Sequence, residues 1–364
     1  MLKLICLFLL ISSTSFAELL KFDDMRLSFL GRFRDEMTYR EFDWPLSTYE
    51  FMVAGKGKIN VRLDGGGARF RIIVGDKTYL LQTQLGTQEY ELATLDSEDF
   101  TLLRIQKISE ARFFLVPGFL NISPARLYSF EIAEGIRVKK AAARLRKIEI
   151  LGDSNSTGFG VLGEPSSPLT GLMSLLSEED ASLAYPEYLS EHFDAELRVI
   201  ATSGKGLVKN AVDYRRQSLL PMPLHWHYQD YDLSHKWSFL SWQPDLFVVF
   251  LGGNDFKTYP YADPDNFAEE YRTLIEKARS YYPNSKILAI CGLHESHQVY
   301  VCPAVKKAFE EYQDVWGDSD VDILSLDPSK FDSLDWGAIQ HLNSRGQKKL
   351  ADFVSEKIAL MMAW

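Results

Sequence analysis

Residues 147 to 160 read Lys-Ile-Glu-Ile-Leu-Gly-Asp-Ser-Asn-Ser-Thr-Gly-Phe-Gly, an apolar run that enters a Gly-Asp-Ser turn. The run 148–151 predicts a strand, and the turn would place the hydroxyl of Ser154 at the carboxyl end of that strand. Open α/β sheets carry their ligand sites at the carboxyl ends of their strands. Because Asp and Ser are also ordinary turn residues, the motif needs support from the rest of the chain.

The C-terminal half alternates short apolar runs with helical patterns. Strands are expected at 148–151, 197–201, 246–251, 286–291 and 322–326. Helices are expected at 185–193, 264–282, 303–317 and 344–362. Within 264–282, apolar residues recur at i, i+4, i+7 and i+8 from Phe267. Continuous apolar strands with intervening helices predict a three-layer α/β/α domain with a parallel sheet over 143–364.

Residues 18–142 have a strand pattern instead. Short runs rich in β-branched and aromatic residues are separated by Gly or Asp turns, and strands are expected at 49–53, 59–63, 70–74, 79–82, 101–108 and 112–116. This spacing predicts an all-β sandwich of jelly-roll type. The Lys/Arg-rich connector 137–146 is expected to be a solvated face. A chain of this length favours two domains.

Residues 1–17 have the pattern of a secretory signal peptide. Lys3 provides a positive start, 4–11 form an apolar stretch, and Ser15-Phe16-Ala17 is a small-x-small cleavage site. A bilayer span needs about 20 apolar residues, so an uncleaved anchor is the less favoured alternative. We expect cleavage near Ala17, a secreted or periplasmic mature chain, and no membrane span after cleavage.

Charge and cysteine content narrow the functional classes. The formal net charge of −10 argues against a nucleic-acid partner, which requires a basic face. Without residues 1–17, Cys291 and Cys302 are the only cysteines. An even count in an oxidising compartment predicts a disulfide between them, with two buried free thiols as the alternative.

Three further segments supply groups that a serine nucleophile needs. They are Ser203-Gly204-Lys205-Gly206, Gly252-Gly253-Asn254-Asp255 and His341. The first two follow expected strands directly, and His341 precedes the last expected helix. The order Ser, Gly, Asn, His resembles the signature of the SGNH hydrolases.

Each of these residues has an expected role in acyl transfer. Ser154 is the nucleophile, its backbone N–H is the first oxyanion donor, and His341 is the general base. Glycine has no Cβ and can bring its N–H close to substrate, so the second donor is Gly206, with Gly204 as the alternative. The side-chain amide of Asn254 is the third donor. The structural alternatives are turn glycines, an Asx turn at Asn254 and a surface helix start at His341.

The acid that would orient the base is missing from its usual place. Many SGNH enzymes carry Asp three residues before the base, where this chain has Ala338. The nearest acid upstream is Asp335. We therefore predict a Ser154/His341 dyad in which backbone carbonyls, or else Asp335, hold the second ring nitrogen.

A Trp- and Tyr-rich stretch lies between the second and third segments and includes Trp226 and Trp237. If it lines the cleft, these two rings would stack on sugars; core packing is the alternative. They are assigned to substrate binding together with Asp153. The histidine pairs His225/His227 and His294/His297 lack further ligands at recognised spacing, so no metal site is predicted.

The likeness extends beyond the catalytic segments. The chain carries Phe29-Leu30-Gly31-Arg32-Phe33, the segment 147–154, Ser203-Gly204-Lys205-Gly206-Leu207-Val208-Lys209-Asn210 and Trp242-Gln243-Pro244-Asp245, followed by Gly252-Gly253-Asn254-Asp255-Phe256. In these segments it resembles carbohydrate esterase family 2 over nearly the whole mature chain. The resemblance implies an exported, two-domain acetyl esterase that removes O-acetyl groups from polysaccharides such as xylan or glucomannan. It implies no cofactor.

One segment departs from the family pattern. The family usually ends in an Asp-Trp-His-Pro type segment, whereas this chain has Ile339-Gln340-His341-Leu342. The acid before the base and the aromatic residue beside it are both lost, although some family members work as a dyad. The alternatives are an esterase for other acyl esters (peptidoglycan O-acetyl groups, small esters or lipids) and a catalytically weak carbohydrate-binding protein.

Overall fold

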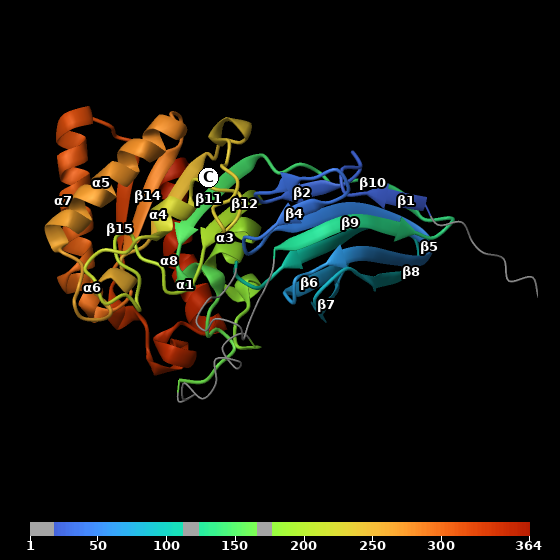
Figure 1. Cartoon of the computed structure of the whole chain (residues 1–364), viewed down its shortest axis with the longest axis horizontal. Coiled ribbons are helices and arrows are strands. Elements are labelled where there is room, and N and C mark those ends of the chain that lie inside the picture. Colours follow the sequence, from blue (N-terminus) through green and yellow to red (C-terminus); the bar gives the residue numbers. More distant parts are fainter. Residues whose placement is uncertain (1–17, 112–123, 166–176) are drawn as a thin grey trace, which may run out of the picture.

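The computed structural model describes residues 18–111, 124–165 and 177–364. The expected signal peptide 1–17 and the expected strand 112–116 lie outside them. Within this part of the chain, the helices are too short or too polar to cross a membrane. An antiparallel β-sheet unit is followed by an α/β unit, and the two lie side by side along the long axis of the molecule (Figure 1).

The described part of the β-sheet unit contains ten strands. They are β1 (Glu18–Lys21), β2 (Ser28–Leu30), β3 (Arg34–Asp35), β4 (Arg40–Phe42), β5 (Thr48–Asp64), β6 (Arg69–Val74), β7 (Lys77–Gln82), β8 (Gln88–Lys107), β9 (Ala125–Ile132) and β10 (Arg137–Lys140). The main strand order is β3-β4-β9-β5-β8-β6-β7, while β2 and β10 pair with β5 and β1 pairs with β9. Every pairing is antiparallel.

The expected strands 49–53 and 59–63 are a single long strand, β5. Gly55 and Gly57 between them do not form a turn. Their φ angles are 121° and 139°, and the pairing with β8 has a bulge between Val53 and Gly55. A Cβ at Gly55 would lie 2.3 Å from the carbonyl oxygen of Gly135, so only glycine fits there. The bulge bends the strand while its ladder continues. The first half of β5 pairs with β2 and β10 and the second half with β9, around one apolar core.

The α/β unit is built on a five-stranded parallel sheet. Its strands are β11 (Arg146–Gly152), β12 (Ala195–Ala201), β13 (Leu246–Phe250), β14 (Lys286–Cys291) and β15 (Val321–Ser325), in the order β12-β11-β13-β14-β15. The chain passes from β11 to β12 on one side of it, and then crosses to β13 on the other side of β11. The carboxyl ends of β11 and β13 therefore form a topological switch point, where ligands bind in such sheets.

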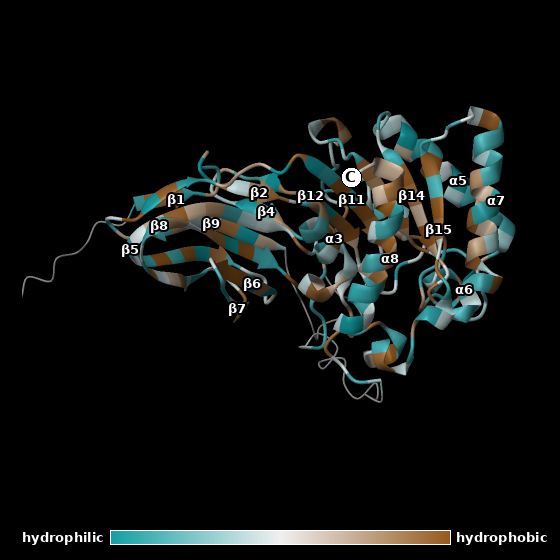
Figure 2. Ribbon diagram, turned by 180° about the vertical axis from the view of Figure 1, so that it is seen from behind, coloured by the Kyte–Doolittle hydropathy of each residue, from teal (hydrophilic) through white to brown (hydrophobic). Residues whose placement is uncertain are grey.

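Helices cover both faces of this sheet. On one face lie α3 (Tyr185–Phe193) and α8 (Ser344–Met362), whose apolar residues share a core with Ile148 and Ile150. On the other lie α5 (Pro264–Tyr281) and α7 (Val301–Trp316), which pack with Leu151. Figure 2 shows the apolar sheet strands between helices with polar outer faces. The expected three-layer α/β/α architecture is confirmed.

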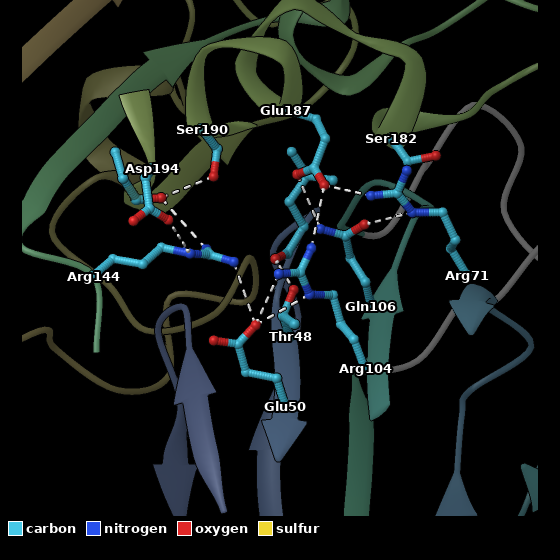
Figure 3. Close-up of polar contacts among 12 residues, drawn as sticks. Thr48, Glu50, Arg71, Arg104, Gln106, Arg144, Ser182, Glu187, Ser190 and Asp194 are labelled. Atoms are coloured by element: carbon cyan, nitrogen blue, oxygen red, sulfur yellow. Dashed lines mark hydrogen bonds and ion pairs between the residues drawn. The ribbon is translucent and has the colours of Figure 1, made fainter. Parts of the chain in front are cut away.

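A network of ion pairs joins the two units (Figure 3). Glu50 of β5 accepts from Arg104 of β8 at 2.9 Å and from Arg144 at 3.3 Å. Glu187 of α3 pairs with Arg71 of β6. Arg144 belongs to the connector that we expected to be solvated. That expectation is wrong for this residue, because its guanidinium is part of the interface.

A second contact between the units is fully buried. Arg32, from the Phe29–Phe33 segment, donates to both carboxylate oxygens of Glu149 in β11 at 3.1 Å. Glu149 also accepts from Trp226 Nε1 at 2.7 Å and Tyr282 Oη at 2.8 Å. Because both charged side chains have no exposed surface, their charges need these partners.

Candidate active site

The nucleophile candidate begins a one-turn helix at the end of β11. This helix is α1 (Ser154–Thr157), and its N-cap is Asp153, whose Oδ1 accepts from the Asn155 N–H at 3.0 Å. Ser154 is therefore the first helical residue, and its N–H lies at the open end of the turn. Its Oγ lies 2.8 Å from Nε2 of His341, although 187 residues separate them. The structure thus brings together the serine and histidine that the sequence suggested.

The segment that follows Ser154 also contacts the segment that carries His341. The Ala338 N–H donates to the carbonyl of Gly160 at 3.0 Å, and a Cβ at Gly160 would lie 2.7 Å from the Ala338 oxygen. The ring of Phe159 meets the His341 ring edge to face at 4.9 Å. The stretch that carries Ser154 therefore also positions its partner.

Two residues before His341 have unusual backbone angles. Ile339 and Gln340 take φ angles of 52° and 61°, in the left-handed region that non-glycine residues seldom adopt. For a β-branched residue such as Ile339 this conformation is a clear outlier, and such strain is often found at functional sites. The Gly337 N–H donates to the His341 carbonyl at 2.7 Å and closes the loop.

The environment of His341 favours its neutral form. Burial, together with the positive charge of Lys257, lowers its pKa to about 3, while the carbonyls of Ile339 and Ala338 act in the opposite direction. Among the residues that the structure describes, no group hydrogen-bonds its Nδ1. The neutral ring is therefore ready to accept a proton at Nε2.

Asp335 does not face this ring. Its Oδ2 accepts from Nζ of Lys349 at 2.5 Å and from the Asp332 N–H at 2.8 Å, as part of a capping box at 333–335. Its contacts are thus those of a structural acid, and they give no support to the orienting role that we considered for it.

The two candidate oxyanion glycines differ in what their N–H groups do. The Gly206 N–H donates to the Asn210 side chain at 3.3 Å, and a Cβ on Gly206 would lie 2.0 Å from the Lys209 carbonyl oxygen. Gly204 has a φ of 77°, and its N–H donates to no group in the described part of the chain. The preference for Gly206 therefore changes, because its amide is already used and its lack of a Cβ serves local packing. Gly204 is the better candidate donor.

Asn254 bridges the three segments after β11, β12 and β13. It follows β13, and its Nδ2 donates to Asp153 Oδ2 at 3.1 Å and to the Lys205 carbonyl at 2.8 Å. Burial raises the pKa of Asp153 to about 6, against the hydrogen bonds from Asn155. The Asn254 amide thus holds the Ser154 turn and the glycine loop together. To act as the third oxyanion donor, its Nδ2 would have to share one of these two hydrogen bonds with the oxyanion. Asp153 acts in this network as well as lining the cleft.

Asp255, which sequence reasoning did not assign, holds the glycine loop from the same side. Its carboxylate accepts from the N–H groups of Leu207, Val208 and Lys209 at 2.7 to 2.9 Å. The close approach of its Oδ2 explains why position 206 is glycine, since a Cβ there would lie 2.6 Å away. The only available sequence signal was its place beside Asn254.

An open cleft of about 740 Å³ leads to the Ser154–His341 pair. Its wall carries rings that the sequence analysis did not assign to substrate binding, chiefly Trp336, Tyr261 and His294. Trp336 stacks on His294 at 5.0 Å with an interplanar angle of 29°. Lys257 also lines the cleft, and its side chain is exposed.

The two tryptophans assigned to substrate binding lie elsewhere. Trp226 has no exposed surface and stacks on Phe247 inside the core. Trp237 lies between the guanidinium groups of Arg32 and Arg198, at 5.0 and 4.9 Å from its ring. Neither ring borders the cleft, so that assignment is wrong. Their aromatic stretch packs where the two units meet.

Cys291 and Cys302 form the expected disulfide, with their Cα atoms 5.5 Å apart. It links the end of β14 to α7 and closes the loop that carries His294 and His297. In the described residues, no group of three or more His, Cys, Asp or Glu side chains is placed to hold a metal ion.

Comparison with known proteins identifies the family of the α/β unit. The sequence profile of the GDSL-like Lipase/Acylhydrolase family matches residues 150–349, which is more than half of the chain. The chain belongs to the GDSL-like lipase/acylhydrolase family. Ser154, Gly204, Asn254 and His341 all fall inside the matched region.

The chain is also similar to curated carbohydrate-active esterases. An acetylxylan esterase/glucomannan deacetylase of Cellvibrio japonicus is 27% identical over 221 residues, 60% of this chain and 56% of that protein. The chain spans about half or less of the length of the curated relatives that it matches.

Solved structures share the fold over nearly the whole chain. A family two carbohydrate esterase from Clostridium thermocellum in complex with cellohexaose superposes with a TM-score of 0.81 at 22% identity, covering 93% of this chain and 99% of that one. An acetyl xylan esterase from the rumen bacterium Butyrivibrio proteoclasticus gives 0.82 at 15% identity, covering 96% and 100%. The fold expected from the resemblance to carbohydrate esterase family 2 is confirmed.

Proposed function

We propose that this protein is an exported serine esterase that removes O-acetyl groups from a polysaccharide, through a Ser154/His341 dyad and an acyl-enzyme. The observation that carries the proposal is the 2.8 Å contact between Ser154 Oγ and His341 Nε2 at the carboxyl end of β11. An activated nucleophile needs its base within such reach. Membership of the GDSL-like lipase/acylhydrolase family and the names of the relatives support ester hydrolysis of a carbohydrate.

The proposed reaction has two halves. In the first, Ser154 Oγ attacks the acetyl carbonyl carbon while His341 Nε2 takes its proton. The tetrahedral oxyanion is met by the N–H groups of Ser154 and Gly204, with Asn254 beside them. The imidazolium then gives its proton to the departing sugar oxygen, which leaves an acetyl-serine. In the second half His341 takes a proton from water, whose oxygen attacks the acetyl carbon, and the proton returns to Ser154 as acetate leaves.

The open shape of the cleft is consistent with a polymer substrate. Trp336 and Tyr261 offer ring faces beside the reacting groups, and aromatic rings present large apolar surface to a sugar. This proposal gives Trp336 the role that the sequence analysis assigned to Trp226 and Trp237.

The test is acetate release from p-nitrophenyl acetate and from acetylated xylan or glucomannan. Ser154→Ala is expected to lower kcat by about a thousandfold or more, because the acyl-enzyme cannot form. Ser156→Ala is the matched control. It removes a buried hydroxyl from the same helix, one that contacts Tyr185 Oη at 3.1 Å, and it should keep kcat within about threefold.

The outcome also separates the alternatives. High activity on p-nitrophenyl esters with none on acetylated polysaccharide would favour an esterase for other acyl groups. Polysaccharide binding without any acetate release by the unmodified protein would contradict the proposal and favour a binding protein.

A further inference from the structure

A buried carboxylate of the β-sheet unit reaches into the glycine loop of the α/β unit. Glu110 follows β8 and has no exposed surface. Its Oε2 accepts from the Ser203 N–H at 2.5 Å and from the Thr202 hydroxyl at 3.1 Å. Thr202 and Ser203 form the start of the loop after β12, immediately before Gly204. The contact therefore joins residues 93 positions apart at the loop that carries the candidate oxyanion donor.

Glu110 is itself held in place by several buried groups. Its N–H donates to Oε1 of Glu179, and its carbonyl accepts from Nζ of Lys107 at 2.8 Å. Lys107 Nζ also binds the carbonyl of Ser109 at 2.8 Å. The backbone around Glu110 is thus fixed on both sides, so that its side chain has one direction in which to extend.

Burial of the Glu110 carboxyl does not favour the stability of the folded state. Burial is the main influence on the Glu110 carboxyl and raises its pKa to about 7, although the Ser203 and Thr202 bonds oppose the shift. Its Oε1 has no hydrogen-bond partner in the part of the chain that the structure describes. A buried carboxyl with one unsatisfied oxygen destabilises the folded state, so an apolar residue would serve packing better. A role for the other oxygen explains why an acid is present.

The loop is held from the opposite side by residues after β13. Asn254 binds the Lys205 carbonyl, and Asp255 accepts three N–H groups of residues 207–209. Gly204 lies between these anchors and the Glu110 contact. On the side of Ser154, the Ser203 hydroxyl lies 3.5 Å from the hydroxyl of Thr157 in α1. Within the described part of the chain, the Ser203 N–H is held by Glu110 alone, whereas the Thr202 hydroxyl is shared between Glu110 and the carbonyl of Ala111, which lies 3.0 Å away.

We propose that Glu110 is a positioning residue, which fixes the Thr202–Gly204 turn from the β-sheet unit so that the Gly204 N–H is held ready for the oxyanion. The β-sheet unit then takes part in the reaction through this one side chain. The inference rests on the proposed esterase function, and it concerns kcat rather than substrate binding. Oxyanion donors act because they are already oriented when charge develops, so a loosened donor loses catalysis before it loses affinity.

Three substitutions test the carboxylate. Glu110→Gln keeps an oxygen at the same reach and should keep kcat for p-nitrophenyl acetate within about threefold. Glu110→Ala removes the acceptor, and Glu110→Asp shortens it by one methylene. Both should lower kcat by about 10- to 100-fold, towards the loss seen when one oxyanion donor is removed, with KM within about twofold.

Glu50→Ala is the control for a purely structural effect. Glu50 is a buried carboxylate where the two units meet. It pairs with Arg104 of β8 and with Arg144, and neither arginine belongs to the glycine loop (Figure 3). It should lower Tm and leave kcat within about twofold. A loss of kcat in Glu50→Ala equal to that in Glu110→Ala would overturn the inference, as would full kcat in a folded Glu110→Asp. The Asp and Gln variants suffice if the Ala variant does not fold.

Failure of the proposed function would look different. The rate at which a fluorophosphonate labels Ser154 reports the nucleophile and the oxyanion site without any need for the true substrate. If the unmodified protein neither labels nor hydrolyses esters, the esterase proposal fails. If it does both and Glu110→Ala labels equally fast, only the role of Glu110 fails.

Discussion

Asp335 Oδ2 lies 2.5 Å from Nζ of Lys349, and the Asp335 carboxylate forms no hydrogen bond with the His341 ring. The acid nearest to the base in sequence is thus committed to the start of α8. Asp335 has no exposed surface, whereas the Lys349 side chain remains 27% exposed. The pair is therefore a local stabilising contact near the proposed base.

Replacing Asp335 should change stability and not chemistry. Asp335→Ala removes the shortest contact of Lys349 Nζ and the acceptor of the Asp332 N–H, so we expect a loss of about 1–3 kcal/mol in the free energy of unfolding. Its kcat should stay within about fivefold, whereas His341→Ala should lower kcat about a thousandfold. Thermal melts and p-nitrophenyl acetate kinetics of both variants check this. Equal losses of kcat would mean that the acid orients the base after all.

The reaction should tolerate acid better than an ordinary histidine base allows. His341 must be neutral to accept the proton of Ser154, and burial lowers its pKa to about 3. Activity is lost as pH falls through the pKa of the base, so kcat/KM should not fall by half near pH 6.5. It should still be at its full value at pH 5, which is about two units above the pKa of His341.

Lys257 provides a control on that pH profile. Its positive charge also lowers the pKa of His341, so Lys257→Gln should raise that pKa and move the acid limb to higher pH. Lys306→Gln, on the exposed face of α7, should leave the limb in place. A limb that stays at the same pH in Lys257→Gln would indicate that another group controls it.

Trp336 should decide affinity for the polymer. Trp336→Ala removes a ring face from the cleft, and we expect the KM for acetylated polysaccharide to rise by about tenfold, the scale of one aromatic contact. The KM for p-nitrophenyl acetate should change little, because that substrate is too small to need the platform. Trp316→Ala, with an exposed ring at the end of α7, is the matched control. No rise in the polymer KM would remove Trp336 from the sugar site.

Trp226 should behave as a core residue. Trp226→Ala leaves a cavity next to Phe247 and deprives Glu149 of a hydrogen bond, so unfolding should become easier by about 3–5 kcal/mol. In the fraction that folds, the polymer KM should match that of the unmodified protein. A stable variant with a raised polymer KM would restore the assignment made from the sequence.

The disulfide should add measurable stability. Cys291 and Cys302 close a loop of 11 residues, for which chain entropy predicts about 2–3 kcal/mol. The double variant Cys291→Ala/Cys302→Ala should therefore unfold at lower temperature. The unmodified protein should show the same decrease when reduced. Identical melting curves before and after reduction would mean that the bond does not form in solution.

Much of the fold could be predicted because its signals are local. The run 148–151 and the amphipathic pattern of 264–282 follow from which residues can be buried along a strand or helix. The two strands expected in place of β5 show the limit. Gly55 and Gly57 look like a turn in sequence, but β5 continues through them, and the close approach of Gly135 to Gly55 is a contact between distant residues.

The type of active site could be predicted from the sequence, but not which glycine donates to the oxyanion or which aromatic rings line the cleft. Ser154, Asn254 and His341 follow sheet strands or precede a helix, so their order along the chain brings them to one edge of the sheet. Which glycine keeps its N–H free depends on Asn210 and Asp255, which reach the loop from other elements. The rings lining the cleft could not be chosen from composition either, because a tryptophan packs equally well in a core or on a wall.

The sequence by itself determined the succession of strands and helices, the position of Ser154 at a strand end and the cysteine pair, since each depends on neighbouring residues or on a count. Only the tertiary structure decided that Asp335 binds Lys349, that the Gly204 N–H is free among the described residues and that Glu110 reaches Ser203. Hydrogen bonds are short and directional, so the choice among several acceptors depends on distances of a few tenths of an ångström. Those distances are set by the packing of the whole chain.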